Sequence, residues 1–160
     1  MDSSDQTATK AKTIQPLEHF YVTGEGNRIA EGVILPSGAF ALSWFGEGHT
    51  HGTYPTLDVF RQIQAGMSGR EIVPGDRTFQ DGQTHPPAAG RTFYLQRNED
   101  YNGISGTGKV AIGFEFEQIT VVQWLSAEGS TFWYKSVALV EHIHGHGGRT
   151  LVVRVTEEND

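Results

Sequence analysis

The sequence predicts an α+β protein made of two tandem copies of one small module, each an antiparallel sheet with one helix, arranged about a pseudo-twofold axis. Three observations predict it. Similar segments recur in the same order, apolar and polar residues alternate as in strands, and one short stretch per copy has the apolar spacing of a helix. The chain has 160 residues, the size of one ordinary domain or of two very small ones sharing a core.

The internal repeat is clearest in its paired Trp, Tyr, Gly and Arg residues. The matching segments are 19–22 with 92–95, 28–35 with 109–116, 41–44 with 121–124, Tyr54 with Tyr134, and 69–73 with 148–152. Because these pairs recur in order, duplication explains them better than a loose alignment of apolar positions. The expected organisation is a disordered tail over residues 1–17, a first module over 18–74, a connector over 75–90 and a second module over 91–156.

Each copy is expected to contain three strands, a short fourth strand, a helix and a last strand. Residues 110–117 alternate between apolar and small or acidic side chains, which is the period of a strand with one apolar face. Short connectors at 36–38 and 117–118 join this strand to the next as an antiparallel hairpin. The helices are expected at 56–64 and 136–144, where apolar residues recur at spacings of three.

The ends of the helices also have sequence signals. Thr56 and Ser136 supply hydroxyl groups that can cap the first turn. Gly66 and Gly145 are expected to end the helices as left-handed C-cap residues. Several strands carry apolar side chains on both faces, and one helix can cover only one face. The two sheets are therefore expected to face each other or to join into one.

Composition excludes several classes of function. The net charge of −7 gives a negative field that repels phosphate backbones, so nucleic acid is not expected as a partner. With no cysteine, the chain has no disulfide, thiolate zinc site or thiol catalysis. No stretch approaches the roughly 18–20 apolar residues of a membrane helix, so no membrane partner is expected. The polar first residues lack a signal-peptide pattern, and the expected location is the cytoplasm.

A glycine-rich stretch at residues 103–109 has the letters of a phosphate-binding loop. Val110 follows the lysine, where a true loop of this kind needs Ser or Thr and the start of a helix. A weaker interpretation remains, in which backbone N–H groups and a lysine bind an anion without hydrolysis. The first copy has a shorter loop and is expected to bind more weakly or not at all. The candidate ligand-binding residues are Ser105, Gly106, Thr107, Gly108, Lys109 and Arg149.

Three clustered histidines, His142, His144 and His146, raise the alternative of a metal-dependent enzyme. Side chains two apart on a helix diverge, and Gly145 marks the end of this helix, so no metal and no other cofactor is expected. No conventional set of acid, base and nucleophile is visible, and no catalytic residue is assigned. The sequence therefore favours a non-enzymatic binding or interaction protein, for a small anionic molecule or another protein. It does not set the oligomeric state.

The second copy resembles a family of small uncharacterised bacterial, archaeal and phage proteins. Their single module has the pattern G-[IV]-S-G-T-G-x-V-A-x-G, a strand with Trp, and a closing H-G-H-x-G-x-T. Here these features are residues 103–113, Trp124 and residues 144–150. The resemblance implies a folded module over about 93–156 and no particular activity. The first copy lacks both the loop and the closing histidines, so only the second would retain a family site.

Overall fold

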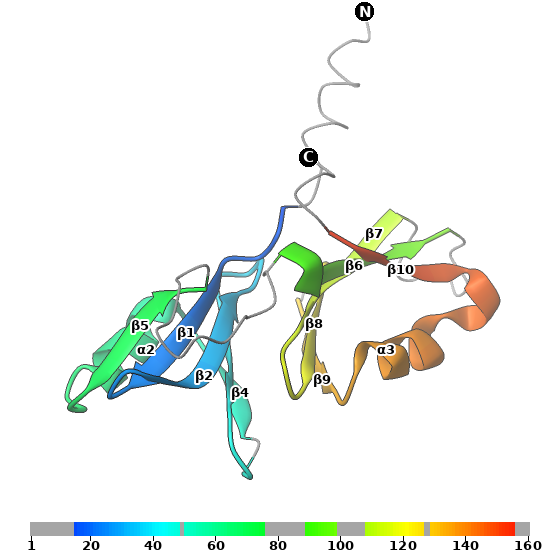
Figure 1. The fold of residues 1–160 in the computed structure, drawn as a ribbon. Coiled ribbons are helices and arrows are strands. Elements are labelled where there is room, and N and C mark those ends of the chain that lie inside the picture. Colours follow the sequence, from blue (N-terminus) through cyan, green and yellow to red (C-terminus); the bar gives the residue numbers. More distant parts are fainter. Residues whose placement is uncertain (1–14, 49, 76–88, 99–107, 127–128, 156–160) are drawn as a thin grey trace, which may run out of the picture.

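Two five-stranded antiparallel sheets form the protein, and each is accompanied by one α-helix (Figure 1). The first sheet has the strand order β4-β3-β2-β1-β5, and the second has the order β10-β6-β7-β8-β9. Read from the opposite edge, the second order is the same as the first, so the predicted duplication is confirmed. The computed structural model describes residues 15–48, 50–75, 89–98, 108–126 and 129–155.

The elements follow one another in the expected order in both modules. The first module contains β1 (His19–Gly24), β2 (Asn27–Ile34), β3 (Phe40–Trp44), β4 (His51–Tyr54), α2 (Leu57–Gln64) and β5 (Arg70–Pro74). The second contains η1 (Ala89–Arg91), β6 (Thr92–Arg97), β7 (Gly108–Glu115), β8 (Thr120–Trp124), β9 (Thr131–Tyr134), α3 (Val137–His144), η2 (His146–Gly148) and β10 (Thr150–Arg154). No helix within the described residues is long and apolar enough to cross a membrane.

Strand pairing corrects the predicted match between the last strands of the two modules. Gly24 in β1 lies opposite Arg70 in β5, whereas Arg97 in β6 lies opposite Thr150 in β10. Arg70 is therefore equivalent to Thr150, and the predicted alignment of Arg70 with Arg149 is wrong by one residue. The connector between helix and last strand has the same length in both modules, so the backbone keeps one register although a Gly-Arg pair recurs one position out of step.

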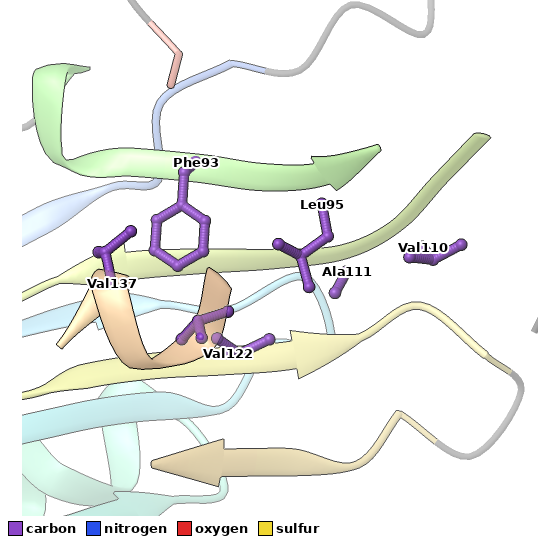
Figure 2. Close-up of a cluster of buried hydrophobic side chains, with 7 residues drawn as sticks. Phe93, Leu95, Val110, Ala111, Val122 and Val137 are labelled. Carbon is purple, nitrogen blue, oxygen red and sulfur yellow. The ribbon is translucent and has the colours of Figure 1, made fainter. Parts of the chain in front are cut away.

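Each helix packs on the outer face of its own sheet. Figure 2 shows the resulting core of the second module, with side chains from the sheet and from α3: Phe93, Leu95, Val110, Ala111, Val122 and Val137. The first module has an equivalent core in which Phe60 of α2 packs against the sheet and is fully buried. Trp124 and Trp44 contribute to these two cores at equivalent positions.

A third core joins the two modules. Its buried members are Val33, Leu35 and Ala41 from the first sheet and Phe114, Phe116 and Val121 from the second. These residues are equivalent pairs in the two modules, which is the contact pattern of a pseudo-twofold arrangement. The layers are thus helix, sheet, sheet and helix, with the helices on the outer sides (Figure 1). Of the two expected arrangements, the sheets face each other.

The helix N-termini agree with the sequence, and the C-termini do not. Thr56 and Ser136 each accept a backbone hydrogen bond of 3.1 Å in the first turn, as predicted. Gly145 has a right-handed φ of −67°, and Gly66 is not among the residues with positive φ, so both predicted left-handed C-caps are wrong. Gly145 is needed for another reason: a Cβ atom there would lie 2.6 Å from the carbonyl oxygen of Glu141.

Candidate functional site

The predicted anion site lies at one end of the second sheet, and the structure describes part of it. Ser105-Gly106-Thr107 lies outside the described residues. Gly108 begins β7 with a φ of +88°, a conformation that favours glycine, and Lys109 follows it with an exposed side chain. Arg149 directly precedes β10 and is also exposed. The end of one sheet therefore carries both predicted cationic residues.

Strand β6 lies between the strands that carry the two cationic residues. Lys109 lies opposite Gln96 in β6, and the backbone N–H of Asn98 donates to the carbonyl oxygen of Arg149 at 2.7 Å. Two strand spacings correspond to about 10 Å across the sheet. Lys109 and Arg149 therefore share a sheet end without being on neighbouring strands.

Lys109 lies on an aromatic ring. Its Nζ is 5.0 Å from the centroid of the half-buried Tyr94 ring, a distance typical of a cation–π contact. Lys109 forms no ion pair with any residue that the structure describes. Two apolar residues flank Lys109, and both are exposed: Leu125 at 41% and Leu151 at 46%. The lysine thus stands between exposed leucines on a face with no described carboxylate against it.

Arg28, the residue of the first module equivalent to Lys109, has different contacts. Its guanidinium lies 4.9 Å from the centroid of the Tyr21 ring and 5.3 Å from that of Phe45. Its Nη1 donates a 2.9 Å hydrogen bond to Oε2 of Glu117, which comes from the second module. Strand pairing makes Arg28 equivalent to Lys109 and Tyr21 equivalent to Tyr94. Within the described part of the chain, Arg28 is therefore neutralised by a carboxylate and Lys109 is not.

The two β-hairpins that cross between the modules explain this difference. Glu117 follows β7 in the hairpin to β8, and the equivalent position between β2 and β3 is Pro36. Ser37 next to it exchanges two 2.9 Å hydrogen bonds with the Gln123 side chain, accepting from Nε2 and donating its backbone N–H to Oε1. The first module's hairpin therefore contacts the second sheet with uncharged groups and has no carboxylate at the position equivalent to Glu117.

A buried carboxylate at the junction of the modules was missed by the sequence reasoning. Glu31 is fully buried and accepts hydrogen bonds from Nη2 of Arg91 to both oxygens, at 2.8 and 2.9 Å. It also contacts Nε2 of His19 at 2.9 Å and accepts from the backbone N–H of Glu117 at 2.7 Å. Since a carboxylate only accepts, the His19 proton belongs on Nε2.

These contacts set the ionisation of Glu31. Burial alone would raise the pKa of its carboxyl group. The hydrogen bond from His19, the charge of Arg91 and the N–H of Glu117 outweigh burial, so the pKa is lowered. The sequence held one signal, because the equivalent residue of the second module is the apolar Ile112. A glutamate at a core position indicates a buried partner.

The histidines of the second module do not form a described metal site. Nε2 of His144 lies 2.8 Å from the hydroxyl of Tyr134, and its ring meets the Trp124 ring edge-on at 5.0 Å. His142 is exposed, and the side chain of His146 lies outside the described part of the chain. Among the described residues, no group of three His, Asp or Glu side chains could hold a metal ion. Burial raises the pKa of Tyr134, partly offset by its hydrogen bond with Trp124.

The first module has a shallow pocket at the C-terminal end of α2. Its volume is about 170 Å³, and its lining includes Arg61, Gln64 and Arg70. Nη1 of Arg70 donates a 2.6 Å hydrogen bond to Oε1 of Gln64, and its guanidinium lies 5.4 Å from the Trp44 ring. The Arg70 side chain is thus held by contacts within its own module, at the C-terminal end of α2.

Comparison with known proteins gives a match to the second module. Residues 90–156 match the family model described as Acb5 phage protein. No curated protein matches the chain, and no solved structure does. The Acb5 match covers β6 to β10 and therefore the elements that place Lys109, Arg149, Tyr134 and His144. The expected likeness to a phage-associated family is confirmed at this level, and the detailed motif and the module boundaries stay predictions.

Proposed function

We propose that this protein is a non-enzymatic binding protein whose second module takes an anionic group at Lys109. One observation carries the proposal. Two equivalent cations lie on equivalent tyrosine rings, and among the residues that the structure describes a carboxylate lies against Arg28 but none against Lys109. Lys109 is exposed and offers up to three N–H donors to an incoming anion.

The surroundings of Lys109 favour binding over catalysis. A charge-assisted hydrogen bond to an ammonium group is stronger than a neutral one, and the aromatic ring beneath it restricts where the charge lies. Arg149 adds a second cation at the same sheet end, and the flanking leucines are apolar. Within the described residues near Lys109, no nucleophile, base and acid lie in mutual hydrogen-bonding contact.

A thermal-shift experiment tests the proposal with inorganic phosphate and a series of phosphorylated and carboxylated metabolites. Anions that stabilise the wild type are expected to lose this effect in Lys109→Ala and to keep it in Lys135→Ala. The control removes the same charge from another exposed position of the second module. An effect that survives Lys109→Ala but vanishes in Arg28→Ala would place the site in the first module and contradict the proposal.

A further inference from the structure

We infer that the Lys109 site takes a carboxylate from an acidic hairpin or loop of a partner protein. This inference rests on the proposed function and names its ligand class. The occupied site of the first module supplies the precedent, because the chain fills it with one of its own side chains. There, the carboxylate of Glu117, at the tip of the β7–β8 hairpin, accepts a hydrogen bond from the Arg28 guanidinium. The guanidinium in turn lies over the Tyr21 ring.

The open site repeats the components of the occupied one. Lys109 replaces Arg28, Tyr94 replaces Tyr21, and Leu125 takes the position of Phe45. The equivalence of the last pair follows from the backbone, since Phe45 donates to the carbonyl of Ile29 and Leu125 to that of Val110. Tyr21 is fully buried, whereas Tyr94 is only half-buried. The second module therefore presents the same kind of surface, with no carboxylate partner among the residues that the structure describes.

The apolar surroundings favour a protein segment over a small carboxylate. Leu151 of β10 lies opposite Gln96, Gln96 lies opposite Lys109, and Leu125 follows beyond β7. This row crosses three strand spacings, or about 14 Å. A small acid would contact the lysine and leave the two exposed leucines in water. The hairpin that carries Glu117 instead buries apolar neighbours, Phe116 and Ile119, in the core between the modules.

Charge complementarity points to the same partner. The chain has a net charge of −7, and Lys109 is a positive point with no described carboxylate against it. An acidic segment is repelled by most of such a surface and attracted at this point, so the charge pattern fixes where it docks. Leucines on both sides supply the apolar contact that a single exposed ion pair lacks.

An NMR titration of the ¹⁵N-labelled full-length protein tests the inference with two peptides. The first has the sequence of residues 114–120 of this chain, closed into a hairpin by a disulfide between added terminal cysteines. The second differs only by Glu117→Gln. Since the protein has no cysteine, the disulfide cannot exchange with it. We expect amide shifts at Lys109, Tyr94 and Leu125, with the Gln peptide binding about fivefold more weakly, a typical effect of one exposed ion pair.

Variants and small ions separate the outcomes. Lys109→Ala is expected to abolish the preference for the Glu peptide, and Lys135→Ala to keep it. Equal binding of both peptides, or shifts at Tyr21 and Arg28 instead, would overturn the inference. Glutarate binding as tightly as the peptide would assign a small carboxylate in place of a protein. Phosphate bound at Lys109 without peptide binding would leave the proposed function standing alone, and no binding of any probe would overturn both.

Discussion

Arg28 of the first module and Glu117 of the second form an ion pair of 2.9 Å that joins the two sheets through a hairpin tip. The side chains are 13% and 33% exposed, so the pair is partly shielded from water. The backbone N–H of the same Glu117 donates to the buried Glu31. One hairpin residue therefore connects a surface pair with the polar cluster inside the junction.

The Arg28–Glu117 pair is expected to contribute a measurable coupling energy. A double-mutant cycle with Arg28→Ala and Glu117→Gln should give about 1 kcal/mol in urea unfolding, because partial burial reduces screening. The matched control is Asp58 and Arg61, which lie 3.7 Å apart with side chains 82% and 51% exposed. Their cycle should give a coupling near zero. Equal coupling in both cycles would mean that the first pair does not hold the modules together.

Gly113→Ala is expected to destabilise the protein by about 1–3 kcal/mol or more, the range for overpacked cores. A Cβ atom there would lie 2.4 Å from Cζ of Phe93 and 2.7 Å from the carbonyl oxygen of Val121. Gly32, the equivalent glycine of the first module, has a comparably close contact with a different ring, 2.3 Å from Cζ of Phe40.

The control for this prediction is Gly52→Ala in the edge strand β4. No atom lies within 4 Å of a Cβ built at Gly52. Chemical denaturation should show little change in its unfolding free energy. A loss in Gly52→Ala as large as that in Gly113→Ala would show that the close contact with the Phe93 ring is not the cause.

The repeat, the element order and the helix N-caps could be predicted because they depend on local chemistry. Thr56 and Ser136 precede their helices and accept hydrogen bonds from residues three positions on. The hairpin between β7 and β8 could be predicted from the alternation of apolar residues along its strands and from a two-residue connector. The contact between the two sheets also followed, because one helix cannot cover both apolar faces of a sheet, but the sequence left open whether the sheets face each other or join into one.

The features that the sequence did not predict correctly depend on distant partners or on backbone register. The recurring Gly-Arg pair suggested that Arg70 matches Arg149, but strand pairing to β1 and β6 sets the register one residue away. The partner of Glu31 is Arg91, 60 positions along the chain, and no local pattern indicates that distance. Glu117 reaches Arg28 from the other module, 89 positions along the chain, whereas the equivalent position in the first module is Pro36. Such a relation becomes visible only when the sheets are placed together.

Glu31→Gln is expected to cost about 3–5 kcal/mol of unfolding free energy, the usual effect of removing one member of a buried charge pair. Arg91 and His19 would both lose a carboxylate while remaining buried. The control is Glu115→Gln, which removes an ion pair with Arg154 whose side chains are 38% and 44% exposed. It should cost less than about 1 kcal/mol in the same urea titration. Similar losses in both variants would contradict a buried, fully paired Glu31.

The lowered pKa of Glu31 predicts how stability changes with pH. A carboxyl group whose pKa is lower in the folded than in the unfolded protein contributes stability above its unfolded pKa. That contribution is lost as the pH falls from about 4.3, the ordinary value for glutamate, through the lower folded value.

Unfolding free energies of the wild type and Glu31→Gln, measured from pH 7 to pH 3, check this dependence. The difference between the two proteins should be largest and constant near neutral pH, and it should shrink on acidification below about pH 4.3. Glu115→Gln, measured in parallel, shows how much of any change comes from a Glu-to-Gln exchange as such. A wild-type advantage over Glu31→Gln that grows as the pH falls would show that the folded pKa is raised and that burial outweighs His19, Arg91 and the Glu117 N–H.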